Sequence, residues 1–189
     1  MWRRVGRALD GNTPREVSDV VWAQVGRYFA DVRSPAPRAE GEEAELCALD
    51  GPQAFSGWLS CEGDLVTWCH DLDTKRLPPG YQDSALLERN GATVVERGPG
   101  YLELWMRAGR GPALVLERVD RTGAPTARIL MVADLTVAVW RGRRAGGATL
   151  RFEDGGWEVE SYVGSGAIPW PAITDAHAGR TPAGWSKVA

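Results

Sequence analysis

The chain has 189 residues, the usual length of one domain with a buried core. Hydrophobic residues make up 43% and charged residues 25%, and the net charge is −3, which gives no electrostatic reason to bind nucleic acid. No apolar run approaches the ~20 residues that span a bilayer, and the basic N-terminus lacks the apolar run of a secretory signal. The three cysteines and two histidines lack the spacing of a metal site, and phosphate-binding motifs are absent, so we expect no metal or cofactor. We expect a cytoplasmic protein with reduced thiols.

The N-terminal residues 1–19 predict an arm with at most a short helix, in which Thr13 caps and Pro14 takes the first helical position. Extended segments follow at residues 20–22 and at Tyr28–Arg33. The polar stretch from Ser34 to Gln53, which contains two prolines and an acidic run, indicates either a mobile loop over a barrel mouth or a solvated excursion.

A hairpin is expected next, with strands Ala54–Glu62 and Leu65–Leu72 joined by a tight turn at Gly63 and Asp64. This two-residue turn pairs Cys61 with Val66 and Cys69 with Trp58, which puts the two thiols on opposite sheet faces and argues against a disulfide.

Further short strands alternate with turn residues through the rest of the chain. They are expected at Ala85–Arg89, Thr93–Arg97, Tyr101–Arg107, Leu114–Val119, Arg128–Val132, Thr136–Arg141, Thr149–Phe152 and Trp157–Val163. Connectors this short permit only antiparallel neighbours, and so long a meander must close on itself or split. We therefore predict an all-β fold with little helix: a closed antiparallel up-and-down barrel of about eight to ten strands over residues 20–163. A two-sheet sandwich is the alternative, and residues 164–189 are expected to form an irregular strap.

The run from Tyr101 to Arg107 alternates without error between two faces. One face carries Tyr101, Glu103, Trp105 and Arg107, and the other carries two leucines and Met106. We expect the aromatic face to line a barrel cavity, with Arg107 as the anchor for a carboxylate head group. Two alternatives stay open: Glu103 and Arg107 form a structural ion pair with each other or with neighbours, or the leucine face lines the interior.

Two other strands offer candidate cavity residues. Asp31 and Arg33 share a strand face and could extend the polar spot, while Trp68 and His70 share another. His70 could act as a general acid or base, although a lone histidine near a strand end is more often an ordinary packed or exposed residue.

The strands at 114–119 and 128–132 are apolar on both faces, which indicates burial on both sides. A second copy of the chain would supply the missing cover, so a homodimer is expected.

The segments Trp22–Gln24, Tyr28–Arg33, Phe55–Trp58, Val66–His70 and Glu103–Arg107 carry a resemblance to calycin-type barrels, the superfamily of lipocalins and fatty-acid-binding proteins. More narrowly, the chain resembles small barrel proteins from actinomycete gene clusters for enediynes and related polyketides. A full lipocalin opening signature and a helical lid are missing. The resemblance implies a cavity for a long apolar ligand such as a fatty acid or polyene.

Two functions fit this reading. The first is non-catalytic binding, in which the barrel sequesters or delivers a long-chain hydrophobic ligand in a natural-product pathway; burial of each methylene contributes roughly 0.8 kcal/mol before ordering costs. The second is a cofactor-independent cyclase or isomerase that acts on a polyketide-type substrate, with Tyr101, Glu103 or His70 transferring protons. The lack of a recognisable nucleophile, metal or cofactor motif favours binding.

Overall fold

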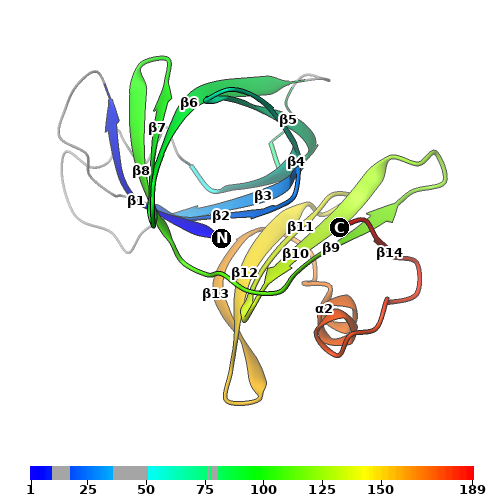
Figure 1. Ribbon diagram of the computed structural model, residues 1–189. Coiled ribbons are helices and arrows are strands. Elements are labelled where there is room, and N and C mark those ends of the chain that lie inside the picture. The colour runs from blue at the N-terminus through cyan, green and yellow to red at the C-terminus, as the bar shows by residue number, and fades with distance from the viewer. Residues whose placement is uncertain (10–17, 36–50, 76, 78–80) are drawn as a thin grey trace.

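The computed structural model describes residues 1–9, 18–35, 51–75, 77 and 81–189, and in this part of the chain it shows a closed barrel next to a second sheet (Figure 1). The barrel strands are β1 (Trp2–Leu9), β2 (Ser18–Val25), β3 (Tyr28–Pro35), β4 (Gln53–Glu62), β5 (Leu65–Asp73), β6 (Gln82–Asn90), β7 (Thr93–Gly98) and β8 (Tyr101–Arg107). Each strand pairs antiparallel with the next, and β1 closes the barrel by pairing with β8.

The two ends of the barrel are built differently. At one end, two-residue turns join β2 to β3, β4 to β5 and β6 to β7, each with a glycine at positive φ (Gly26, Gly63 and Gly91). At the other end, the connections 10–17, 36–52 and 74–81 are longer, and only the turn from β7 to β8 is tight. This second end is the mouth of the barrel.

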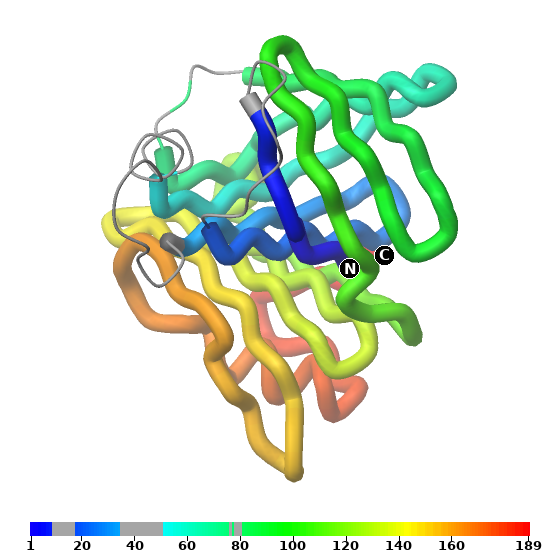
Figure 2. Tube along the Cα trace, turned by 90° about the vertical axis from the view of Figure 1, so that its left-hand side faces the viewer, coloured from blue at the N-terminus to red at the C-terminus, as the bar shows by residue number. Residues whose placement is uncertain are grey.

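The remaining strands form a sheet of order β13-β12-β11-β10-β9-β14. They are β9 (Ala113–Val119), β10 (Pro125–Val132), β11 (Leu135–Trp140), β12 (Gly146–Glu153), β13 (Gly156–Gly164) and β14 (Ser186–Lys187), with helix α2 (Trp170–His177) before β14. The sheet packs against the outer face of the barrel wall formed by β2, β3 and β4 (Figures 1 and 2).

Small and β-branched side chains fill the layer between the barrel and the second sheet. Val21, Ala30 and Val32 of the barrel pack here against Leu130 and Val137 of the sheet. At one point no side chain fits, because a Cβ at Gly147 would collide with the Cβ of Ala54 on β4. The close approach of the barrel and the second sheet therefore requires a glycine at position 147.

The other face of the second sheet is covered by the chain itself. Ala172, Ile173 and Ala176 of α2 pack against a cluster that includes Ile129 and Leu150. Strands β10 and β11 thus lie between the barrel and α2 (Figure 1), which explains why both of their faces are apolar. The inference of a homodimer from these two faces was wrong, because the cover comes from within the chain; dimerisation itself stays a prediction.

A buried arginine crosses the layer between the sheets. Arg128 of β10 is 1% exposed and donates to both carboxylate oxygens of Asp71 on β5, at 2.8 and 2.9 Å. It also donates to Glu117 of β9 and to the hydroxyl of Ser56 on β4. Asp71 can reach it because β5 bulges at this residue. The arginine therefore holds the sheet and the bulged barrel wall in one register.

The structure confirms the predicted all-β, closed, up-and-down barrel, but the barrel contains residues 2–107, and the strands from 113 onward form the second sheet. Two segments differ from expectation: residues 2–9 form the closing strand, and the C-terminal strap contains a helix. The expected pairing of Cys61 with Val66 and of Cys69 with Trp58 is confirmed, and both thiols are free. The predicted Thr13 cap and most of the Ser34–Gln53 loop lie outside the described residues. In the part of the chain that the structure describes, no helix has the length and apolar character that crossing a bilayer requires.

Candidate functional site

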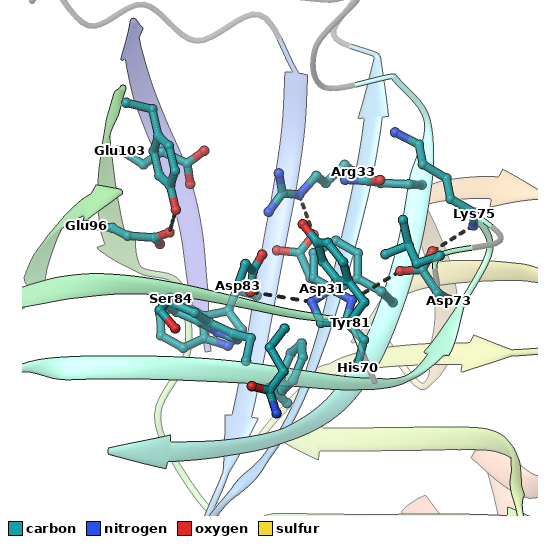
Figure 3. Close-up of a pocket in the computed structure, with 18 of the residues that line it drawn as sticks. Asp31, Arg33, His70, Asp73, Lys75, Tyr81, Asp83, Ser84, Glu96 and Glu103 are labelled. Atoms are coloured by element: carbon teal, nitrogen blue, oxygen red, sulfur yellow. Dashed lines mark hydrogen bonds and ion pairs between the residues drawn. The ribbon is translucent and has the colours of Figure 1, made fainter. Parts of the chain in front are cut away.

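The mouth half of the barrel encloses a cavity of about 640 Å³ (Figure 3). Below it, the interior is packed with apolar side chains, among them Trp22, Trp68 and Trp105. Trp22 meets Trp68 edge-on at 5.9 Å and Trp105 at 5.6 Å between ring centroids. The cavity therefore rests on an aromatic floor.

The walls above this floor are strongly polar. They carry acidic, basic and imidazole side chains from most of the barrel strands, namely Arg7, Asp31, Arg33, His70, Asp73, Lys75, Asp83, Glu96 and Glu103. Glu96 and Glu103 lie on one side of the cavity, His70 and Asp73 lie on the other, and Asp31, Arg33 and Asp83 lie between them (Figure 3). Most of these charges are matched by opposite charges within the wall.

Glu103 is held by two arginines of β1. Its Oε1 lies 2.8 Å from Nη1 of Arg4 and 3.4 Å from Nε of Arg7, and its side chain is 2% exposed. A β-bulge at Val5 shifts the register of β1 between Arg4 and Gly6, so Arg4 pairs with Trp105 and Arg7 pairs with Glu103. Without the bulge, the two arginines would point to opposite faces, because their spacing of three residues is odd.

Glu96 accepts hydrogen bonds on both of its carboxyl oxygens. The hydroxyl of Tyr101 donates to Oε1 at 2.8 Å, and the indole N–H of Trp105 donates to Oε2 at 3.0 Å. Burial and the nearby charge of Glu103 raise the pKa of Glu96 to about 8, against the effect of the hydrogen bond from Tyr101. Burial and Glu96 raise the pKa of Tyr101 as well, so the phenol keeps its proton.

Tyr101 reaches Glu96 because the position opposite it has no side chain. Tyr101 pairs with Gly98 across the two-residue Pro99-Gly100 turn, and a Cβ at Gly98 would collide with the Tyr101 ring and hydroxyl. The guanidinium of Arg7 lies 5.3 Å from the ring centroid, over the phenol. The ring is therefore fixed between Gly98 and Arg7.

Asp31 and Arg33 form a second ion pair in the wall. Nε of Arg33 lies 2.9 Å from Oδ1 of Asp31, and the guanidinium lies over the ring of Phe55 at 5.0 Å. Burial raises the pKa of Asp31, although Arg33 opposes this rise.

His70 forms the polar group on the opposite wall. Its Nδ1 lies 3.1 Å from Oδ2 of Asp73, its Nε2 lies 3.6 Å from Oδ1 of Asp83, and its ring stacks on Phe55 at 4.5 Å. Burial lowers the pKa of His70, but the two carboxylates outweigh burial and raise the pKa to about 9. His70 is therefore an imidazolium at neutral pH, and a proton donor rather than a base.

Several buried polar atoms of the cavity wall have no hydrogen-bond partner among the described residues. They include Nε1 of Trp22, a donor, and Oε2 of Glu103, an acceptor. A buried donor or acceptor without a partner costs about 1–3 kcal/mol. Both residues line the cavity, so these two atoms are candidate contacts for a bound molecule.

The structure places seven of the eight predicted site residues around this cavity: Asp31, Arg33, Trp68, His70, Tyr101, Glu103 and Trp105. The aromatic face of the Tyr101–Arg107 strand points inward as far as Trp105. Arg107 lies at the opposite end of the barrel, exposed, where it donates to the carbonyl of Gly91 and lies 5.0 Å from the ring centroid of Trp2. It therefore neither anchors a head group in the cavity nor pairs with Glu103.

The sequence reasoning missed Arg4, Arg7, Asp83 and Glu96. Arg4 and Arg7 lie on a strand that was not predicted, in a segment whose Gly6 is typical of a bulge. Glu96 lies on a predicted strand, and a two-residue turn at Pro99-Gly100 would have put it opposite Glu103. Asp83 precedes the expected start of its strand. Among the described residues, no group of three or more His, Cys, Asp or Glu side chains could hold a metal ion.

The sequence matches no protein-family model, no curated protein and no solved structure.

Proposed function

We propose that the barrel binds a compact small molecule with a flat conjugated body, at least one hydrogen-bond donor and at least one acceptor. The supporting observation is the pair of buried cavity atoms without partners, the indole N–H of Trp22 and Oε2 of Glu103. A ligand that accepts from the first and donates to the second satisfies both atoms at once.

The size and floor of the cavity suit such a ligand. A volume of about 640 Å³ lies within the range of small-molecule sites. The tryptophans of the floor offer ring faces and edges against which a conjugated body can stack. Stacking supplies affinity, and the polar walls orient the ligand.

The polar walls favour a more polar ligand than the long-chain fatty acid expected from the sequence. A hydrocarbon chain beside Asp31, His70 and Glu103 would displace the water that solvates these charged groups and would offer them no hydrogen bonds in its place. A hydroxylated, carbonyl-bearing polyketide intermediate fits both walls and floor. The proposal thus keeps the calycin-like barrel and the enediyne or polyketide pathway that the sequence resemblance implies.

Titration of tryptophan fluorescence with two probes tests this function. We expect 1,8-dihydroxyanthraquinone, which is flat and carries donors and acceptors, to bind more tightly than palmitic acid. Trp22→Phe keeps an aromatic ring but removes the donor, and should weaken quinone binding about tenfold, which corresponds to about 1.4 kcal/mol.

The matched control is Thr136→Val in the second sheet, which removes a buried hydroxyl that also lacks a partner among the described residues but does not line the cavity. This variant should leave quinone binding unchanged. Tighter binding of palmitic acid, or equal binding of the quinone to wild type and Trp22→Phe, would contradict the proposal.

A further inference from the structure

We propose that the cavity also catalyses keto–enol tautomerisation of a bound carbonyl compound, with Glu103 as the base and Tyr101 as the acid. This inference rests on the proposed function, since the carbonyl compound must first bind in the barrel. It adds a chemical step and a substrate class: ketones with a flat aromatic or conjugated body and an acidic α C–H bond.

The acid and the base lie on one wall. Tyr101 and Glu103 are two residues apart on β8, and both face the cavity. Two residues along a strand span about 6.6 Å. A carbonyl oxygen and its α-hydrogen can therefore contact the two side chains from a single ligand position.

Glu103 has the features of a fixed base. Its Oε1 is held by Arg4 and Arg7, which leaves the carboxylate little freedom to turn. Its Oε2 is buried and has no partner among the described residues. This oxygen is the one that can accept a proton from a ligand.

Glu96 can supply a proton to Tyr101. The Tyr101 hydroxyl is 2.8 Å from Oε1 of Glu96, whose other oxygen accepts from Trp105. Because the pKa of Glu96 is raised to about 8, its carboxyl group holds a proton over most of the neutral range. A protonated Glu96 can donate to the Tyr101 oxygen, which frees the phenol proton for a ligand oxygen.

The step balances within the site. Oε2 of Glu103 takes the α-proton, the C–H electron pair forms the new C=C bond, and the carbonyl π electrons move to oxygen. That oxygen takes the proton of Tyr101, and Tyr101 takes the proton of Glu96. The products are the enol, a protonated Glu103 and a Glu96 carboxylate. The two glutamates hold one proton before and after the step, and its return from Glu103 to Glu96 resets the site without any cofactor.

The pH dependence follows from the charged groups around Glu96. Those that act on its carboxyl group are Arg33 of β3, Asp83 of β6, Tyr101 and Glu103 of β8, with Arg4 and Arg7 of β1 behind Glu103. The reaction requires the protonated form of Glu96. We expect the rate to fall as the pH rises through about 8.

Deuterium exchange into 2-tetralone, a benzo-fused cyclic ketone with acidic benzylic α-hydrogens, tests the step. In D₂O, loss of the α-proton NMR signal reports each enolisation, while tryptophan quenching reports binding. We expect wild type to accelerate exchange over buffer by about 100-fold or more, the usual range for a positioned acid and base. Glu103→Gln should abolish the acceleration, and Tyr101→Phe should reduce it at least tenfold.

Two further variants distinguish a lost base from a lost fold and test the role of Glu96. Glu103→Asp keeps a carboxylate for Arg4 and Arg7 but withdraws it by one methylene, so exchange should slow while the fold is kept. Glu96→Gln cannot supply a proton to Tyr101, so exchange should be slow at every pH and should no longer fall above pH 8. Thr136→Val, in the second sheet and away from the cavity, should leave exchange unchanged, and His70→Gln tests whether the opposite wall takes part.

The outcomes separate the two proposals. Binding of 2-tetralone without accelerated exchange overturns the tautomerase and leaves the binding function intact. If 2-tetralone neither binds nor shows accelerated exchange, the result contradicts both proposals. Exchange that survives Glu103→Gln and disappears in His70→Gln assigns the chemistry to the opposite wall and overturns the roles of Glu103 as base and Tyr101 as acid.

Discussion

Glu96 of β7 and Glu103 of β8 are directly opposite each other in the strand register, and both side chains are buried inside the barrel. Like charges in this position destabilise a sheet. The two side chains have different partners: Glu103 pairs with two arginines, while Glu96 accepts from two neutral donors and has a raised pKa. The wall therefore pairs one of its two facing carboxyl groups with cations and the other with neutral donors.

Replacement of Glu96 by glutamine should stabilise the protein at alkaline pH. The folded state raises the pKa of Glu96 from 4.5 to about 8, so wild type loses stability as pH rises between these values, with a slope approaching about 1.4 kcal/mol per pH unit. Glu96→Gln removes this loss. Urea unfolding at pH 5 and pH 8.5 should show similar stabilities at the lower pH and a more stable variant at the higher one; equal stability at both would contradict the assigned pKa.

His70 should also make the protein less stable as the pH rises, but by losing a positive charge where Glu96 gains a negative one. The folded pKa of about 9 for His70 exceeds the ordinary 6.5, so its contribution is complete below about pH 6.5 and is lost as pH rises through about 9. The stability difference between wild type and His70→Gln should therefore shrink over this range, by about 3 kcal/mol at most. Denaturant titrations every half pH unit measure this, and a difference that grows with pH would show that the imidazole is neutral in the folded protein.

Gly98→Ala should weaken ligand binding, although Gly98 does not line the cavity. The new methyl group collides with the Tyr101 ring and moves its hydroxyl away from Glu96. We expect the loss in 1,8-dihydroxyanthraquinone affinity to match that of Tyr101→Phe. The double variant should be no weaker than either single one, because both changes remove the same interaction; additive losses would mean that the alanine acts elsewhere.

Arg128→Met should destabilise the fold strongly. The change leaves the carboxylates of Asp71 and Glu117 in the layer between barrel and sheet without their cation, which typically costs about 3–5 kcal/mol. Arg151→Met is the control, because Arg151 also bridges acidic residues but is 25% exposed, and it should cost about 1 kcal/mol or less. Comparable losses in urea unfolding would show that burial of Arg128 does not matter.

Gly147→Val should separate the second sheet from the barrel. A side chain at this position meets Ala54 and Val32 across the layer, and overpacking of this kind costs about 1–3 kcal/mol. Gly156→Ala lies on the neighbouring strand, where the nearest atom to an added Cβ is the carbonyl oxygen of Glu153 at 3.9 Å, and it should be nearly neutral. The thermal midpoints of the two variants provide the comparison, and a tolerated valine would contradict the close approach.

The sequence by itself determined the class of fold and which residues of a strand share a face. Strict alternation from Tyr101 to Trp105 and the pair Asp31–Arg33 grouped these side chains, because side chains of a strand alternate between two faces whatever the strand pairs with. Alternation did not decide which of the two faces points into the barrel. Short turns likewise required antiparallel neighbours, and the pairing of Cys69 with Trp58 followed from one two-residue turn.

Only the tertiary structure decided where the barrel closes and how its charges pair. Closure by β1, the bulge that turns Arg4 and Arg7 toward Glu103, and the packing of β10 between barrel and helix all depend on contacts between residues far apart in the chain. Alternation also could not show how far the inward face extends along the barrel axis. Trp105 completes the cavity floor and Arg107, two residues later, reaches the closed end, because the position of the floor is set by the packing of side chains from several strands.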